Sequence, residues 1–286
     1  MRTDRSLLLV VNSSRPAAQK AAQELASIFA ASNFNVLTNV ESEISHTALA
    51  DSTSLHGCEI AIVLGGDGTM LRGAEAVRGL DIPLLGVNLG HVGFLAEVEK
   101  PSIREVADSV INKTYLIDVR MVLAYSVERS GAEIAQGWAL NEVTIEREST
   151  TMVQLFVQID RRPLSRWGCD GLICATPTGS TAYAFSAGGP VVWPEVEALV
   201  LLPISAHALF AKPMVVSPSS EIVIDVESPD ASLLGDSLRK FALQEGDRVR
   251  ITKDSEIVSL AHLKESLFSD RLVAKFKLPV EGWRGE

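Results

Sequence analysis

The feature that most constrains the fold is a short apolar run, Ile60–Leu64, which stops abruptly at Gly65-Gly66. A continuous apolar run of this length indicates a strand buried on both faces, as in parallel sheets. Thr69 then has the chemistry of a helix cap, and apolar residues follow it at helical spacing, namely Met70, Leu71, Ala74 and Val77. The segment therefore predicts a strand, a glycine turn and a helix in direct succession.

The same alternation runs through the first part of the chain. Leu7–Val11 is an apolar run of strand length, and Pro16 is well suited to the first turn of the helix that follows it. Pro83–Val87 reads as another buried strand, and Ser102–Glu105 has the spacing of a capping box. Residues 1–118 are therefore expected to form a Rossmann-like α/β domain with a parallel sheet.

From about Val119 the hydrophobic period changes from helical to alternating. Apolar residues occupy every second position of Val153–Ile159, and Arg248–Ile251 is a short strand pattern. Residues 119–265 are therefore expected to form a mostly-β sandwich domain. Residues 266–286 regain a weak helical pattern and are expected to pack back on the first domain.

The composition limits which binding partners and which cellular location are expected. The net charge of −10 repels phosphate backbones at long range, so neither nucleic acid nor a membrane surface is expected as a partner. No run approaches the roughly 20 apolar residues of a membrane span, and Leu7–Val11 is too short for a signal-peptide core. Cys58, Cys169 and Cys174 form no metal-binding pattern, so we expect reduced thiols in a cytoplasmic protein.

The segment Gly65-Gly66-Asp67-Gly68-Thr69 lies between the predicted strand and helix. Glycines let backbone N–H groups approach a phosphate, and a helix N-terminus favours negative charge, so the segment predicts a phosphate cradle. It is neither a Walker A loop nor a GxGxxG fingerprint. A carboxylate beside phosphates has two interpretations: Asp67 accepts the proton of an attacking hydroxyl, or it only orders its turn.

A second polar segment, Gly168–Pro190, runs from a short apolar strand into hydroxyls, glycines and one aromatic residue. The hydroxyls of Thr178, Ser180, Thr181 and Ser186 could bond ribose and base edges, and Asp170 could accept from an amide or a ribose hydroxyl. The alternative is a structural loop rich in Ser, Thr and Gly.

These two segments, with Asn141-Glu142 between them, resemble the motifs of NAD kinases in type and in order. The resemblance implies that Asp67 is the proton acceptor and that a basic position, Arg72, and the aromatic Phe94 belong to the ligand site; a solvated helix arginine is the other interpretation of Arg72. The implied nucleotide-binding residues are Gly65, Gly66, Gly68, Thr69, Arg72, Phe94, Asn141, Glu142, Asp170, Thr178, Thr181, Ala182, Tyr183 and Ser186.

The resemblance further implies transfer of the terminal phosphoryl group of ATP to the 2′-hydroxyl of the adenosine ribose of NAD. Mg²⁺ or another divalent metal would accompany the donor, although no residue is identified as its ligand, and a homodimer or homotetramer is expected. Inorganic polyphosphate stays open as a second donor. Two alternatives remain at this point: a lipid kinase that shares the GGDGT segment, and a non-catalytic NAD(P)-binding regulator.

Overall fold

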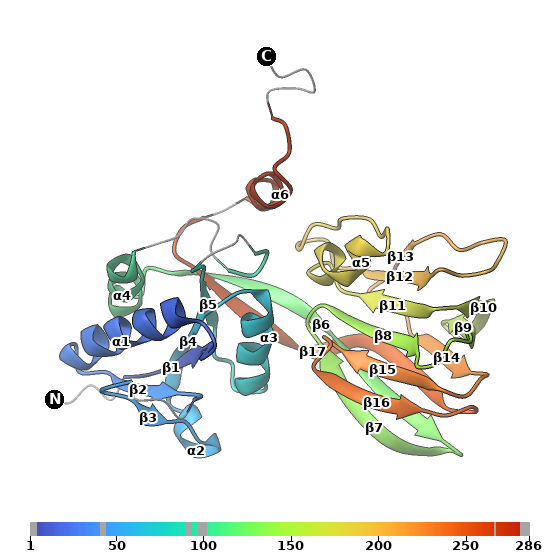
Figure 1. The fold of residues 1–286 in the computed structure, drawn as a ribbon, viewed down its shortest axis with the longest axis horizontal. Coiled ribbons are helices and arrows are strands. Elements are labelled where there is room, and N and C mark those ends of the chain that lie inside the picture. The colour runs from blue at the N-terminus through green and yellow to red at the C-terminus, as the bar shows by residue number, and fades with distance from the viewer. Residues whose placement is uncertain (1–4, 41–43, 90–92, 97–101, 266, 281–286) are drawn as a thin grey trace. The chain divides into compact units, whose positions relative to one another are not determined.

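The computed structural model describes residues 5–40, 44–89, 93–96, 102–265 and 267–280. Contacts divide the chain into two units, Met1–Val119 with Val258–Glu286 and Arg120–Ile257 (Figure 1). The first boundary expected from the sequence, after residue 118, lies beside this division. The second, after residue 265, lies later than the observed one because Leu260 and Ala261 already pair with a strand of the first unit.

The first unit is built on a parallel sheet. Its strands are ordered β17-β5-β4-β1-β2-β3, and the end of β17 pairs in parallel with β5. This arrangement confirms the predicted α/β domain. Its elements are β1 (Ser6–Val11), α1 (Pro16–Ala31), β2 (Asn35–Thr38), β3 (Ala48–Leu49), α2 (Ser52–Leu55), β4 (Cys58–Leu64), α3 (Asp67–Ala76), β5 (Leu84–Val87), α4 (Ile103–Asn112) and α6 (Phe268–Phe276).

Alternation along the strands explains why helices cover both faces of this sheet. Leu7 and Leu9 of β1 belong to the core cluster that also contains residues of α1 and α4. The alternate residues of the strands point to the opposite face of the sheet, against α3. A Cβ built on Gly73 of α3 would lie 2.9 Å from Val63 Cγ2 and 3.8 Å from Val10 Cγ2. α3 therefore packs close to the sheet only because position 73 has no side chain.

The start of α3 differs from the sequence expectation. Gly66, not Thr69, is the N-cap residue, and the helix begins at Asp67. The carbonyl of Gly66 accepts hydrogen bonds from the N–H groups of Thr69 and Met70, so Thr69 already lies within the first turn. The capping box predicted at Ser102–Glu105 is present at the start of α4 and is thereby confirmed.

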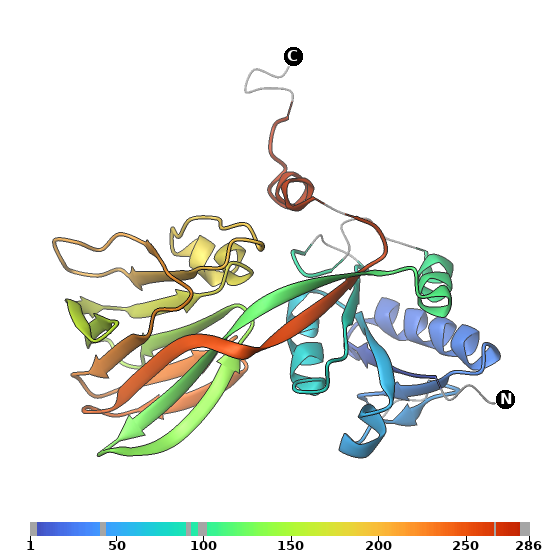
Figure 2. The same cartoon turned by 180° about the vertical axis from the view of Figure 1, so that it is seen from behind.

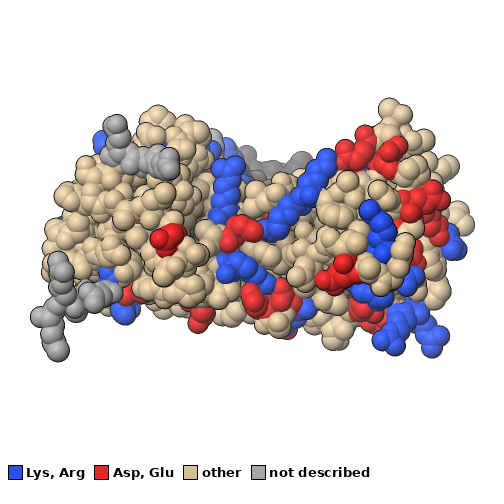
Figure 3. Space-filling view, turned by 90° about the horizontal axis from the view of Figure 1, so that it is seen from below, with Lys and Arg blue, Asp and Glu red and all other residues tan. Residues whose placement is uncertain are grey.

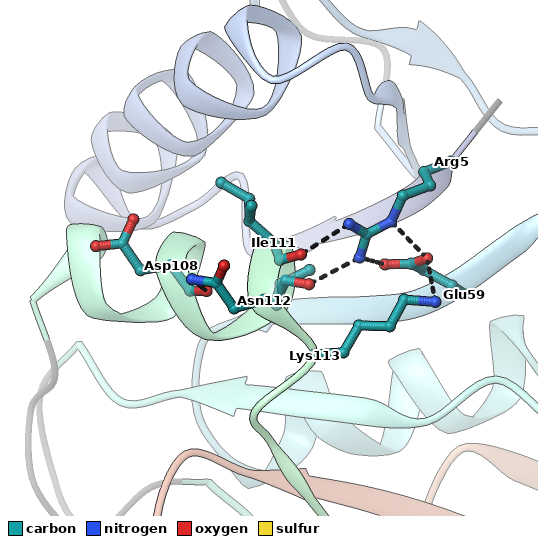
Figure 4. Close-up of polar contacts among 7 residues, drawn as sticks. Arg5, Glu59, Asp108, Ile111, Asn112 and Lys113 are labelled. Atoms are coloured by element: carbon teal, nitrogen blue, oxygen red, sulfur yellow. Dashed lines mark hydrogen bonds and ion pairs between the residues drawn. The ribbon is translucent and has the colours of Figure 1, made fainter. Parts of the chain in front are cut away.

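Arg5 joins the beginning of β1 to the end of α4 (Figure 4). Its Nη1 donates to the carbonyl of Ile111 and its Nη2 to the carbonyl of Val110, both at 2.8 Å. Its Nε also donates to Glu59 Oε2 at 2.9 Å. The guanidinium thus satisfies carbonyl groups that the last turn of a helix leaves without intrahelical partners.

The second unit is mostly antiparallel β. Its strands form two groups, β10-β9-β14-β17 with β6 and β7, and β13-β12-β11-β8-β15-β16; Figure 2 shows the long strands β6 and β17 side by side. The elements are β6 (Leu116–Arg129), β7 (Ala132–Ala139), β8 (Glu142–Arg147), β9 (Val153–Ile159), β10 (Arg162–Cys169), β11 (Gly171–Ala175), the 3₁₀ turn η1 (Gly179–Thr181), α5 (Tyr183–Ser186), β12 (Leu199–Ile204), β13 (Met214–Val216), β14 (Ile222–Val226), β15 (Ala231–Gly235), β16 (Arg239–Leu243) and β17 (Arg248–His262).

One core cluster takes side chains from both groups of strands, which is the packing of a sandwich. Trp167 of β10 is the largest fully buried side chain in this unit, and its Nε1 donates to the carbonyl of Phe210. The mostly-β sandwich is therefore confirmed. The expected strand Arg248–Ile251 is too short, however: β17 continues through polar residues to His262 because β6 pairs with it.

Within the described ranges, no helix has the length and apolar character needed to cross a membrane. Cys58, Cys169 and Cys174 are buried and form no disulfide, and burial raises the pKa of Cys58 to about 11 and those of Cys169 and Cys174 to about 12. On the face shown in Figure 3, Lys and Arg are interspersed with Asp and Glu, so this face carries no basic patch for nucleic acid.

Candidate functional site

The phosphate cradle in the first unit is shaped by two close approaches. β4 ends at Leu64 and α3 begins at Asp67, so only Gly65 and Gly66 connect them. A Cβ on Gly65 would lie 2.2 Å from Thr69 Oγ1, which excludes any side chain at position 65. Gly68 is exposed in the first turn of α3, where the helix N-terminus favours an anion. The arrangement suits a phosphate group.

Asp67 is held in one orientation by the segment 93–96. The backbone N–H of Phe94 donates to Asp67 Oδ2 and that of Leu95 donates to Oδ1, both at 3.2 Å. A Cβ on Gly93 would lie 2.2 Å from Asp67 Oδ1, so this approach requires glycine. The carboxylate is half-buried, and each oxygen keeps a second lone pair for a further donor.

Phe94 and Arg72 differ in their surroundings. The ring of Phe94 is buried, with centroid distances of 6.1 Å to Phe268 and 5.7 Å to Phe276 of α6. Arg72 is exposed on α3. His91, which lies three residues before Phe94 in the sequence, is outside the described residues.

In the second unit, the Asn141-Glu142 turn is held from two sides. The carboxylate of Asp236 accepts hydrogen bonds from the N–H groups of Leu140 (2.8 Å), Asn141 (2.7 Å) and Glu142 (3.3 Å). From the other side, Thr176 Oγ1 donates to the carbonyl of Leu140 at 2.6 Å, and the N–H of Thr176 donates to the carbonyl of Asn141 at 2.8 Å. The turn is therefore fixed before any ligand binds.

Glu142 carries an unsatisfied acceptor at this turn. Its side chain is buried, with 5% of the residue exposed, and its Oε2 atom has no hydrogen-bond partner among the described residues. Burial, and next the negative charge of Asp236, raise the pKa of Glu142 to about 8, although the N–H of Tyr183 favours the charged form. Such a buried polar atom is a natural partner for a hydroxyl or amide of a ligand.

The hydroxyl-rich segment after β11 divides into inner and outer residues. Ser180 is fully buried. Its hydroxyl donates to the carbonyls of Pro177 and Val192 and accepts from the N–H of Val192, so it belongs to the scaffold and not to the ligand contacts expected from its chemistry. Thr178 is also buried. Thr181 and Ala182 are half-buried, and Tyr183 and Ser186 are exposed beside them.

Tyr183 faces a group of acidic side chains. Burial first, and then the charges of Glu146, Glu142 and Asp170, raise the pKa of its phenol. The phenol therefore stays protonated and keeps its O–H as a donor. This donor and the Glu142 carboxyl lie on the same part of the unit.

Asp170 lies at the other end of β11 from the Asn141-Glu142 turn. In the antiparallel pairing of β11 with β8, Gly171 is opposite Glu146, and Ala175 is opposite Glu142. Asp170 accepts a hydrogen bond from Arg147 Nε at 2.6 Å. Asp170 therefore lies at the far end of β11 from the Asn141-Glu142 turn, but its charge still acts on the Tyr183 phenol.

The described residues do not form a metal cage. Across these ranges, no group of three or more His, Cys, Asp and Glu side chains is placed to hold a metal ion. Mg²⁺ prefers to keep waters and substrate phosphates as ligands and needs only one or two carboxylates from the protein. A magnesium ion that is bound to the phosphates of a donor would therefore need few further ligands from the protein.

Sequence reasoning missed three residues that shape these sites. The roles of Gly93 and Asp236 were not predicted, because each acts through a contact with a residue far along the chain. Arg271 is a third: it lies on α6, is 3% exposed, and donates through Nη1 to the carbonyls of Phe94 (2.9 Å) and Ala96 (3.1 Å). An arginine in a weakly helical segment has no local feature that would indicate such burial.

Two family models match the chain. Residues 7–115 match the ATP-NAD kinase N-terminal domain, and residues 140–263 match the ATP-NAD kinase C-terminal domain. The first match lies within the first unit, and the second covers most of the second unit and the beginning of the returning segment 258–286. The resemblance found in the sequence motifs is thereby confirmed.

Curated relatives and solved structures agree with these models. An NAD kinase 2 from Streptomyces avermitilis is 47% identical, over 98% of this chain and 97% of the relative, and an NAD kinase from Thermobifida fusca is 44% identical, over 99% and 92%.

Two crystal structures below 25% identity show the same fold. Yeast NADH kinase complexed with NADH aligns with a TM-score of 0.87 at 23% identity, over 98% of this chain and 89% of the other. An NAD kinase from Archaeoglobus fulgidus in complex with ATP aligns with a TM-score of 0.72 at 24% identity, over 96% and 99%. Fold, family models and relatives of nearly equal length agree, and the chain belongs to the NAD kinase family.

Proposed function

We propose that this chain transfers the terminal phosphoryl group of ATP to the 2′-hydroxyl of the adenosine ribose of NAD, giving NADP and ADP. The observation that carries this proposal is the placement of Asp67. Its carboxylate is fixed by two backbone N–H groups at the N-terminus of α3, directly after a glycine turn that suits a phosphate. A carboxylate in this place can accept the proton of a hydroxyl group that attacks the phosphate.

In the proposed reaction, Asp67 accepts the proton of the 2′-hydroxyl as its oxygen attacks the γ-phosphorus. The new O–P bond forms while the bond from the γ-phosphorus to the leaving ADP oxygen breaks. Gly65, Gly66, Gly68 and Thr69 form the cradle for donor phosphates, and the N-terminus of α3 offsets part of their negative charge. Arg72 is exposed close by on the same helix and is proposed to reach the phosphates when they are bound.

The dinucleotide contacts are proposed for the second unit. The unsatisfied Glu142 Oε2 is suited to accept from a ribose hydroxyl, and the side chain of Asn141 supplies both a donor and an acceptor. Further ligand contacts are proposed for Thr178, Thr181, Ala182, Tyr183 and Ser186, and Phe94 and Asp170 complete the proposed set. Magnesium is proposed to arrive bound to the phosphates of ATP, where it neutralises charge that develops during transfer.

The direct test is formation of NADP by the purified full-length chain from NAD and magnesium-ATP, read with an NADP-specific dehydrogenase. We expect turnover that requires all three components. NAD binding by calorimetry without turnover would favour a non-catalytic regulator, and absence of both would contradict the proposal. A parallel assay with inorganic polyphosphate as the only donor decides whether ATP is required.

Neither alternative reading has support from the relatives named above, since each is an NAD or NADH kinase. A lipid kinase also requires a hydrophobic acceptor and a membrane-facing surface. The assay separates the alternatives further, because a lipid kinase would consume ATP with diacylglycerol and not with NAD.

A homodimer or homotetramer in the cytoplasm is the remaining part of the proposal. Leu209, Phe210 and Val215 are exposed apolar side chains in the second unit, which suits an interface between copies of the chain. Three unpaired buried thiols suit a reducing compartment. Light scattering on the purified protein tests the oligomer: a monomer at micromolar concentration would contradict it.

A further inference from the structure

The C-terminal helix α6 is tied to the segment that holds Asp67. Arg271 Nη1 donates to the carbonyls of Phe94 and Ala96, and the N–H groups of Phe94 and Leu95 donate to the Asp67 carboxylate. Both sets of hydrogen bonds use the same backbone segment, one through its carbonyls and the other through its N–H groups. A movement of this segment therefore moves the carboxylate.

The surroundings of Arg271 fix its guanidinium firmly. The residue is 3% exposed, and its Nη2 lies 3.0 Å from His262 Nδ1 at the end of β17. His262 Nε2 in turn lies 3.6 Å from Asp118 Oδ2. Because a buried guanidinium is costly unless its donors are satisfied, these contacts make the orientation of Arg271 specific.

Aromatic contacts hold α6 and the segment together at the same place. Phe268 and Phe276 lie at the two ends of α6, and their rings both pack against the ring of Phe94. Positions 268, 271 and 275 are spaced by three and four residues, so they share one face of the helix. Lys275 Nζ lies 5.9 Å from the centroid of the Phe94 ring. Side chains of α6 thus contact both the backbone and the ring of Phe94.

We propose that Arg271 is a positioning residue for phosphoryl transfer, which sets the direction of the Asp67 carboxylate through the backbone of Phe94–Ala96. The inference rests on the proposed function of Asp67 as the proton acceptor. α6 thus affects catalysis indirectly: it lies far from the cradle in sequence, and none of its side chains takes part in the reaction.

The test is a double-mutant cycle on kcat for NADP formation, with Arg271→Met and Asp67→Asn alone and combined. Methionine keeps much of the side-chain volume and removes the donors. We expect Arg271→Met to lower kcat by about tenfold to a hundredfold, since small misplacements of a catalytic group have effects of this size, and to change KM for NAD by less than about threefold. In the Asp67→Asn background the same substitution is expected to change kcat by less than about twofold.

Arg5→Met is the matched control. Arg5 also donates to two backbone carbonyls of the first unit, those of Val110 and Ile111, but these carbonyls belong to the end of α4 (Figure 4). Its loss is expected to lower the thermal unfolding midpoint and to leave kcat within about twofold of wild type. A purely structural effect of losing a guanidinium would appear equally in both variants.

If Arg271→Met does not fold, Arg271→Lys replaces it in the cycle, because an ammonium group keeps the charge and can still donate to one carbonyl. A folded Arg271→Met protein whose kcat stays within about twofold of wild type would overturn the inference, as would a tenfold loss that persists in the Asp67→Asn background. For Arg271→Lys, a loss of kcat that is as large with Asn as with Asp at position 67 would overturn it. Absence of NADP formation by the wild-type protein would overturn the proposed function itself, and this inference with it.

Discussion

Asp236 accepts a 2.7 Å hydrogen bond from the backbone N–H of Asn141, a residue 95 positions earlier in the chain. The same carboxylate accepts from the N–H groups of Leu140 and Glu142 and from Arg239 Nη2 at 3.0 Å. One buried side chain thus orders the whole Asn141-Glu142 turn. Burial, its largest influence, raises the pKa of Asp236, and the four donors oppose this shift.

We expect Asp236→Asn to weaken NAD binding. The amide NH₂ of asparagine would face a backbone N–H that now donates to a carboxylate oxygen, so one buried donor would lose its partner, at a cost of about 1–3 kcal/mol in unfolding free energy. The turn would shift, and KM for NAD is expected to rise by about tenfold while the protein remains folded. Steady-state kinetics and thermal unfolding measure both effects.

Asp160→Asn is the control for this prediction. Asp160 also has a positive φ, 51°, equal to that of Asp236, and its Oδ1 also accepts a backbone N–H, that of Glu221. It lies in the turn between β9 and β10, however, so its substitution tests loss of a similar bond elsewhere. A rise in KM for NAD of the same size in both variants would contradict a specific role for Asp236.

Glu142 predicts a pH dependence of stability. Its pKa in the folded protein, about 8, is higher than the ordinary value of 4.5, so the folded state binds more protons than the unfolded state between these values. The contribution of Glu142 to the free energy of unfolding is therefore fully present below about pH 4.5, and it is lost as the pH rises through about 8. Asp236, whose pKa is also raised, contributes with the same sign.

Glu142→Gln isolates this contribution, because glutamine resembles the protonated glutamic acid and does not titrate. We expect the unfolding midpoint of the wild-type protein to fall more between pH 6 and about pH 8.5 than that of the variant. Thermal melts at both pH values measure the difference. Parallel pH profiles for the two proteins would mean that Glu142 is already ionised at neutral pH.

Gly93→Ala is expected to impair catalysis by direct displacement of Asp67. The new methyl group would lie 2.2 Å from Oδ1 and 2.8 Å from Cγ of the carboxylate, so the side chain or the segment must move. We expect kcat to fall by about tenfold to a hundredfold, with little change in KM for NAD. Gly57→Ala is the control, since a Cβ there meets only the carbonyl oxygen of Ser54 at 3.9 Å.

The sequence predicted those parts of the fold that are determined by interactions between residues close together in the chain. Ile60–Leu64, Pro16 and the Ser102–Glu105 capping box each act within a few residues, and the structure contains the expected strand and helices. The start of α3 was misplaced because a threonine and a glycine can both cap, and the close contact of Thr69 with Gly65 is visible only in three dimensions. β17 was underestimated because its polar middle is stabilised by pairing with β6.

The sequence indicated the motif residues of the candidate site but not the residues that support them. Asp67 and Asn141-Glu142 stand in recognisable motifs. Asp236 and Arg271 act on those motifs through backbone groups, which carry no side-chain identity and leave no pattern in the sequence. Ser180 shows the opposite case: its hydroxyl has the right chemistry for a ligand, but its burial commits it to Pro177 and Val192.

The most direct test of the central claim is the rate of NADP formation by Asp67→Asn at saturating NAD and magnesium-ATP. Loss of the proton acceptor is expected to lower kcat by about a hundredfold to ten-thousandfold, while NAD affinity measured by calorimetry stays near that of the wild-type protein. A folded Asp67→Asn protein that binds NAD and retains near-wild-type turnover would contradict the assignment of Asp67 as the base.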